Sequence, residues 1–112
     1  MKNYLSLNQN RDFQRVYARG KFFVSPVLVS YVMRSRRRSS LRIGITTSKK
    51  TGNAVRRNRS RRVIREAFRA IRAEIRPGYD LVFVARAKTP FVKTGDVRQA
   101  MEQHLRNAGI LH

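Results

Sequence analysis

The segment between residues 54 and 76, AVRRNRSRRVIREAFRAIRAEIR, predicts the longest element of the fold. Asn53 is a suitable N-cap, and Pro77-Gly78 ends the pattern. We therefore expect a helix from Ala54 to about Arg76 that packs one face against a core. The apolar side chains of that face recur at steps of three and four residues, the spacing of an amphipathic helix, and are Ile64, Ala67, Phe68, Ile71 and Ile75.

The same segment carries a row of cationic side chains away from the expected core. Between Lys49 and Arg72 there are ten basic residues and one acid, Glu66. Like charges at this density repel one another along a helix, whereas a merely solvated face normally mixes signs. The row therefore favours a surface for phosphate groups, helped by the positive dipole end of the helix near Asn53. Its members at helical spacing are Asn58, Arg62, Arg65, Arg69, Arg72 and Arg76, flanked by Arg57 and Arg61.

Strand patterns lie on both sides of this predicted helix. Residues rich in β-branched and aromatic side chains predict strands at Gly20–Val24, Val27–Arg34 and Leu41–Thr47. A further strand is expected at Tyr79–Ala85, whose apolar centre is typical of a strand buried on both faces.

Two shorter helices complete the pattern. Asn10 is a plausible N-cap for the first, which runs to Arg19 and stops at Gly20, and the second spans Thr94–Asn107. The order of elements is then helix, two or three strands, helix, strand, helix. This order predicts a single α+β domain over residues 1–112, a two-layer α-β sandwich with three helices and a mixed sheet of about four strands.

The overall charge points to a polyanionic partner. The 112 residues include 26 Lys and Arg but only 6 Asp and Glu, for a formal net charge of +20. Such a charge destabilises a compact chain unless a polyanion relieves the repulsion, so a nucleic acid is the expected partner. Twenty of the cations are arginines, which grip phosphate bidentately and stack on bases. A biased genomic base composition is the alternative origin of that excess.

Other features limit the compartment and the chemistry. The chain has no cysteine, which agrees with a reducing cytoplasm, and its apolar runs are too short to span a bilayer. The six acids are scattered and mostly lie beside arginines, with no spacing that suggests a metal site. His104 falls on an apolar stripe and His112 is the last residue, so neither is a good acid or base. We expect a cytoplasmic protein, free of membrane contact, that binds no metal or cofactor and is not catalytic alone.

Residues 48–66, SKKTGNAVRRNRSRRVIRE, resemble the signature of the bacterial ribonuclease P protein family. Arg57-Asn58-Arg59 matches the RNR motif of that family, followed at the expected spacing by Arg61, Arg62 and Arg65. A lone Arg-Asn-Arg means little, but the long ordered string is specific. The resemblance covers nearly the whole chain, through Asn10–Tyr17, Arg42–Ile45 and Asp80–Arg86.

The resemblance implies a subunit of ribonuclease P, the ribonucleoprotein endoribonuclease that removes the 5′ leader from precursor tRNA. In this family the RNA subunit performs the chemistry with Mg²⁺, and the protein binds both that RNA and the leader. Neutralised phosphates should lower the Mg²⁺ requirement, and a held leader should favour precursor over mature tRNA. The fold implied includes a left-handed β-α-β crossover through the long helix, although such connections are nearly always right-handed.

The family's binding residues carry over by position. A cleft between the first helix and the sheet is expected to hold the leader, with Phe13, Tyr17, Tyr31 and Arg61 in it; aromatic faces beside a basic groove hold single strands. Phe13 is expected to be half core and half platform, and Phe68 and Phe83 to be core. The residues expected to bind the RNA subunit are Lys49, Lys50, Asn53, Arg56, Arg57, Asn58, Arg59, Arg61, Arg62, Arg65 and Arg69.

Three rival functions fit the composition less well. A ribosomal or other RNA-assembly protein shares the arginine-rich α+β character, but not the long string. A DNA-binding architectural protein would favour a helix-turn-helix or a β-arm, so no DNA partner is expected. A self-sufficient nuclease lacks its acid, base or metal residues. The basic tip Arg36-Arg37-Arg38 either touches RNA or is solvated, and solvation is favoured.

Overall fold

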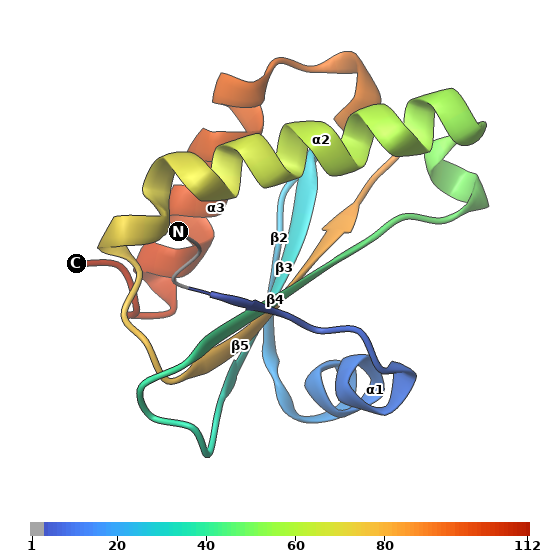
Figure 1. Ribbon diagram of the computed structural model, residues 1–112. Coiled ribbons are helices and arrows are strands. Elements are labelled where there is room, and N and C mark those ends of the chain that lie inside the picture. Colours follow the sequence, from blue (N-terminus) through green and yellow to red (C-terminus); the bar gives the residue numbers. More distant parts are fainter. Residues whose placement is uncertain (1–3) are drawn as a thin grey trace.

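The computed structural model describes residues 4–112, so the first three residues of the predicted domain lie outside the described range. Figure 1 shows a sheet with helices α2 and α3 on one side and α1 on the other. The elements are β1 (Leu5–Ser6), α1 (Asn10–Arg19), β2 (Lys21–Val24), β3 (Leu28–Arg34), β4 (Leu41–Thr46), the 3₁₀ turn η1 (Lys49–Thr51), α2 (Ala54–Ile71), η2 (Arg72–Glu74), β5 (Tyr79–Ala85), η3 (Thr89–Phe91) and α3 (Thr94–Asn107).

The sheet is mixed, with the strand order β1-β4-β5-β3-β2. Strands β1, β4 and β5 are parallel to one another, whereas β3 runs antiparallel to both β5 and β2. The predicted α+β class with three helices and a mixed sheet is confirmed, with a fifth strand, β1, added at one edge. Neighbouring parallel strands β4 and β5 are joined through α2, which makes a β-α-β crossover. The hand of that crossover stays a prediction.

The main core lies between the sheet and the pair α2 and α3. The predicted inner face of the long helix is confirmed for Ile64, Ala67, Phe68 and Ile71, which are all buried. Phe68 packs against Phe83 of β5, with ring centroids 6.1 Å apart, and both side chains are fully buried as expected. Each large apolar side chain removed from water contributes about 1.5–3 kcal/mol, so this face fixes α2 on the sheet.

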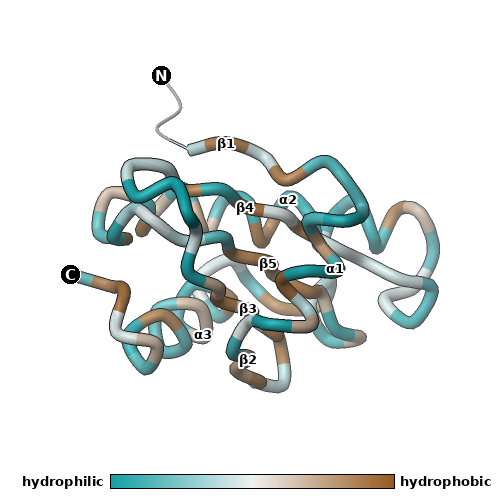
Figure 2. Tube along the Cα trace, turned by 90° about the horizontal axis from the view of Figure 1, so that it is seen from below, coloured by the Kyte–Doolittle hydropathy of each residue, from teal (hydrophilic) through white to brown (hydrophobic). Residues whose placement is uncertain are grey.

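A second, smaller core lies on the other face of the sheet, beneath α1. Val16 of α1, Val82 of β5 and Leu7 are buried there. Val82 points to α1 while its neighbours Leu81 and Phe83 point to α2, so the predicted burial of this strand on both faces is confirmed. Figure 2, which looks from the α1 side, shows apolar residues in β3 and β5 beside α1.

The long helix ends earlier than predicted. α2 stops at Ile71, a 3₁₀ turn follows, and the backbone at Ile75 is extended. Ile75 is still buried, but it pairs with Leu111 in an isolated bridge instead of continuing the helix. The spacing of apolar residues predicted a longer helix because Ile75 fits the helical spacing, and a buried residue is apolar whether its backbone is helical or extended.

The ends of the short helices differ in detail from the predictions. Asn10 is the first helical residue of α1; the N-cap is Gln9, whose side chain makes no capping bond. Gly20 does end the helix, but in an extended conformation, with φ −76° and ψ 156°. At the end of α3, Gly109 has φ 76°, a left-handed conformation that glycine adopts without strain.

An ion pair ties β4 to β5 on the α1 side of the sheet. Arg42 and Asp80 are direct cross-strand neighbours, and the guanidinium donates two hydrogen bonds to the carboxylate, at 2.9 and 2.7 Å. Asp80 is only 1% exposed, and Asp12 of α1 approaches the same guanidinium at 3.9 Å. The hydrogen bond to Asp80 raises the pKa of Arg42 above its ordinary value in spite of partial burial. The pair therefore links two strands and α1.

No helix within residues 4–112 is long and apolar enough to cross a membrane.

Replacement of the buried carboxylate should destabilise the fold. In Asp80→Ala the Arg42 guanidinium would lose its bidentate partner in a largely buried site, so we expect the free energy of unfolding to fall by about 3–5 kcal/mol. Urea denaturation at neutral pH measures this. The matched control is Glu102→Ala, which breaks the more exposed pair with Arg98 and should cost no more than about 1 kcal/mol. Equal losses in the two variants would contradict the assignment.

Candidate nucleic-acid interface

Two local caps set the start of α2. Ser48 accepts a hydrogen bond from the backbone N–H of Lys50 and caps the turn η1, which lies between β4 and α2. Gly52 then takes φ 125°, a conformation that favours glycine, and turns the chain into the helix. The predicted N-cap is confirmed, because the Asn53 side chain accepts from Arg56 N–H at 3.0 Å. Lys49, Lys50 and Asn53 are consequently exposed at the helix N-terminus.

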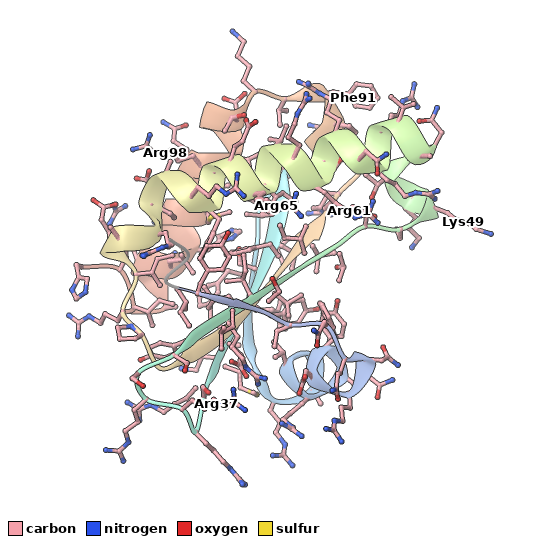
Figure 3. The ribbon with its side chains drawn as sticks, viewed as in Figure 1. Arg37, Lys49, Arg61, Arg65, Phe91 and Arg98 are labelled. Atoms are coloured by element: carbon pink, nitrogen blue, oxygen red, sulfur yellow. The ribbon has the colours of Figure 1, made fainter. Side chains whose placement is uncertain are left out.

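One flank of α2 carries Arg61, Arg65 and Arg69 at four-residue steps toward the edge of the sheet. These three arginines line a groove of about 450 Å³ whose other side includes Ser6 of β1 and Ile43, Gly44 and Ile45 of β4. Figure 3 shows Arg61 and Arg65 on the side of α2 that faces the strands. Arg61 is oriented by a hydrogen bond to the Asn58 side chain at 3.2 Å. We call Arg61, Arg65 and Arg69 the arginine row.

Within the described residues, no arginine of α2 lies within ion-pair distance of an acid. The ion pairs found among these residues involve α1, α3 and the strands instead. The guanidinium groups of α2 therefore have most of their N–H donors available, and the phosphates of a polyanion are acceptors that fit them.

The opposite flank of α2 faces the turn η3. Arg59 donates from Nε to the carbonyl of Pro90 at 2.7 Å, and the Arg56 guanidinium lies over the Phe91 ring, 5.0 Å from its centroid. Arg62 is exposed between the two flanks, and Arg57 is half-buried. The residues predicted as one RNA-binding group thus occupy two flanks of the helix, only one of which carries the arginine row.

Aromatic side chains gather on the α1 side of the sheet. Tyr17 and Tyr31 meet edge to face, with ring centroids 4.9 Å apart, and the ring of Phe22 in β2 lies 5.8 Å from that of Tyr31. The Tyr17 hydroxyl donates to the Thr46 side chain at 3.3 Å. Tyr17 is 39% exposed and Phe22 is 63% exposed, so these rings are available to a ligand. We call Tyr17, Phe22 and Tyr31 the aromatic cluster.

Phe13 is half-buried beside this cluster, as predicted. A Cβ on Gly44 would lie 2.4 Å from the Phe13 ring, so the ring packs directly on the glycine backbone. Phe13 also lines the groove of the arginine row, whereas Tyr17 and Tyr31 do not. The structure therefore brings Phe13 and Arg61 to one groove at the β1–β4 edge of the sheet, and it brings Tyr17 together with Tyr31 on the α1 face.

A second groove on this face was not predicted from the sequence. It has a volume of about 770 Å³, an apolar floor that includes Val29 and Val84, and a basic edge of Lys50, Arg86 and Lys88. Sequence reasoning also missed Phe22. Strand alternation was the available signal, since Phe23 turns inward to stack on His104 and its neighbour Phe22 must then face outward.

The described residues bring together no catalytic constellation. Among residues 4–112, no group of three or more histidines and acids is placed to hold a metal ion. His104 is buried, shares a 2.7 Å hydrogen bond with Ser30, and its burial lowers its pKa, so it is neutral at physiological pH. His112 is exposed at the end of the chain. What these surfaces can do is hold phosphates and stack on bases.

A small α+β domain with an unpaired arginine helix and an aromatic sheet face defines an RNA-binding protein. The family model for ribonuclease P matches residues 1–109. The chain belongs to the ribonuclease P protein family, whose members are the protein subunits of a ribonucleoprotein endoribonuclease that processes tRNA. The resemblance found in the sequence is thereby confirmed.

Relatives support this assignment over almost the whole length. The ribonuclease P protein component of Clostridioides difficile strain 630 is 39% identical over 105 residues, which cover 93% of this chain and 91% of the relative. That of Clostridium novyi strain NT is 38% identical over 111 residues, 98% of each chain.

Solved structures agree with the fold. The RNase P protein of Staphylococcus aureus, determined at 2.0 Å, matches with a TM-score of 0.83 and 32% identity, over 99% of this chain and 100% of that one. The RNase P protein of Thermotoga maritima matches with a TM-score of 0.79 and 29% identity, over 91% of this chain and 96% of that one.

Binding of a small polyanion should stabilise the folded protein through the arginine row. Pyrophosphate at low millimolar concentration is expected to raise the melting temperature by roughly 4 °C, which corresponds to about 1 kcal/mol of ligand binding in a domain of this size. Differential scanning fluorimetry against potassium chloride of equal ionic strength measures the rise. Arg61→Ala/Arg65→Ala/Arg69→Ala should lose most of it.

The matched control removes three charges elsewhere. Arg36, Arg37 and Arg38 are exposed at the tip between β3 and β4, and Figure 3 shows Arg37 at the opposite end of the molecule from α2. The Arg36→Ala/Arg37→Ala/Arg38→Ala variant should keep the full stabilisation by pyrophosphate. A loss in the tip variant alone would move the anion site from α2 to the tip.

Proposed function

We propose that this chain binds the ribonuclease P RNA subunit through α2 with its preceding loop, and holds the 5′ leader of precursor tRNA on the α1 face of the sheet. The observation that carries this proposal is the arginine row: three guanidinium groups at one-turn spacing along a groove, with no acid at ion-pair distance among residues 4–112. A folded RNA backbone presents phosphates that such a row can follow.

The leader is the ligand that best fits the aromatic cluster. Single-stranded nucleotides expose their bases, which stack on aromatic side chains while nearby cations hold the phosphates. The cluster supplies the rings, and Lys50, Arg86 and Lys88 supply charge at the edge of the neighbouring groove. A paired RNA helix would not present its bases to this face. The cluster and the groove therefore favour a single strand.

The proposal divides the work between protein and RNA. The RNA subunit carries out the hydrolysis with Mg²⁺, and the protein neutralises phosphates, so that less Mg²⁺ is needed for folding and substrate binding. Because the leader is present in the substrate and absent from mature tRNA, contacts with it favour substrate over product. The cytoplasm is the compartment that this function requires, and DNA is not a partner.

Reconstitution at low Mg²⁺ tests the proposal. Purified protein, a bacterial ribonuclease P RNA and labelled precursor tRNA are mixed at a Mg²⁺ concentration too low for the RNA alone. Cleavage is expected from the mixture and from neither component by itself. Arg65→Ala should require more protein for the same rescue, and the salt slope of its RNA binding should be smaller by about one phosphate contact.

The control for Arg65→Ala is Arg98→Ala, which removes an exposed arginine of α3 that already pairs with Glu102. This variant should rescue cleavage like the wild type. Cleavage of precursor tRNA by the protein without RNA, or an unchanged salt slope in Arg65→Ala, would refute the corresponding part of the proposal.

Loss of one ring from the aromatic cluster should reduce discrimination for the leader. Tyr17→Ala is expected to lower the affinity of the holoenzyme for precursor tRNA by about tenfold, since one stacked base contributes about 1–3 kcal/mol, and to leave the affinity for mature tRNA unchanged. Equilibrium binding with the two tRNAs measures the ratio. Tyr17→Phe keeps the ring and loses only the bond to Thr46, so it should behave like the wild type. An unaltered ratio in Tyr17→Ala would exclude Tyr17 from the leader site.

A further inference from the structure

Phe91 is an aromatic side chain held outside the core by a rigid turn. Its two predecessors in η3, Thr89 and Pro90, are both buried, whereas Phe91 is 67% exposed. The Thr89 hydroxyl donates to the carbonyl of Val27 and accepts from the N–H of Arg86, both at 2.7 Å. From the other side, Arg59 donates to the carbonyl of Pro90. The backbone that carries Phe91 is therefore fixed before any ligand arrives.

The Phe91 ring is in contact with one guanidinium group. The Arg56 guanidinium lies over it at 5.0 Å from the centroid, in a cation–π contact that orients both groups. Val55, the residue before Arg56, is 76% exposed. In Figure 3 Phe91 lies above α2, while Arg61 and Arg65 lie below it. This surface is thus separate from the arginine row and from the aromatic cluster.

The charge around Phe91 selects its partner. A second copy of this chain would bring another net charge of +20 to the same place, and the repulsion disfavours self-association. Arg56 lies over the ring and Arg59 bonds to the neighbouring Pro90 carbonyl, and neither has an acidic partner among the ion pairs of the described residues. An unpaired nucleotide of a folded RNA fits this site because it carries both a flat base and a negatively charged phosphate. Bases stack on aromatic rings and on guanidinium planes.

We propose that Phe91 and Arg56 form a stacking site for one unpaired nucleobase of the RNA subunit, an inference that rests on the proposed function. The site lies on the flank of α2 opposite to the arginine row, so the RNA subunit contacts α2 from both flanks. Stacking at Phe91 adds a contact that is independent of phosphate neutralisation and therefore hardly depends on salt.

The chain itself provides a clean reporter for this site. It contains no tryptophan, so Phe91→Trp places a single indole at the proposed stacking position. Titration with the ribonuclease P RNA subunit should quench the fluorescence of that indole. Gln103→Trp, on the exposed side of α3, is the control and should be quenched much less. An unquenched Phe91→Trp that still binds the RNA subunit would overturn the stacking site and leave the proposed function intact.

Affinity measurements distinguish aromatic stacking from a nonspecific apolar contact. Phe91→Ala and Phe91→Leu should weaken binding of the RNA subunit about fivefold or more, with the salt slope unchanged, while Phe91→Trp should bind like the wild type. Equal binding of all three variants overturns the proposal, as does Phe91→Leu binding like the wild type, because an apolar contact is then sufficient. If the wild-type protein fails to bind the RNA subunit at all, the proposed function fails first.

Sedimentation and urea denaturation complete the test. The wild-type protein and Phe91→Ala should both sediment as monomers and share one unfolding midpoint, since an exposed ring contributes little to folding. Concentration-dependent association of the wild type that disappears in Phe91→Ala would show that a second copy, instead of RNA, covers the ring.

Discussion

The structure depends on the packing of one helix that must be apolar on one side and cationic on the rest. Val63, Ile64, Ala67, Phe68 and Ile71 of α2 are buried against the sheet, and that burial holds a helix whose arginines repel one another. Because the apolar side is fixed to β4 and β5, the remaining directions of the helix are also fixed. The arginines are therefore held in a set geometry along two flanks, unlike those of a disordered basic tail. The backbone entropy lost in ordering them is lost during folding and not on binding.

The two faces of the sheet divide the remaining tasks. The face toward α2 and α3 holds the larger core and gives the domain most of its stability. On the other face, α1 covers only a small core, and the Asp12–Arg42–Asp80 contacts and the packing of Phe13 on Gly44 hold it there. This incomplete cover leaves Tyr17, Tyr31 and Phe22 accessible. A sheet face that is only partly covered leaves aromatic rings exposed in a protein this small.

Local pattern was enough to predict the helices, most strands and the inner side of α2, since those depend on residue spacing alone. It was not enough for β1, because two residues have no periodicity and Leu5 pairs with Arg42 only once the sheet exists. The early end of α2 also depends on a distant partner, Leu111, which holds Ile75 in an extended bridge. On α2, charge counting drew attention to the arginines but treated them as one surface. The contacts of Arg56 and Arg59 with η3 could not be predicted from the sequence, because the position of that turn depends on the bond from the buried Thr89 hydroxyl to the distant Val27 carbonyl.

The short strand β1 affects how readily the subunit aggregates while no RNA is bound. Unpaired amides along a sheet edge can template the addition of another chain, which leads to aggregation. Here β1 pairs with part of the outer side of β4, and the N–H of Leu7 continues this pairing with a 2.7 Å hydrogen bond to the carbonyl of Ile43. The opposite edge strand, β2, has only four residues and begins with Lys21. Because both edge strands of the sheet are short, the protein without its RNA presents little free edge to which another chain could add.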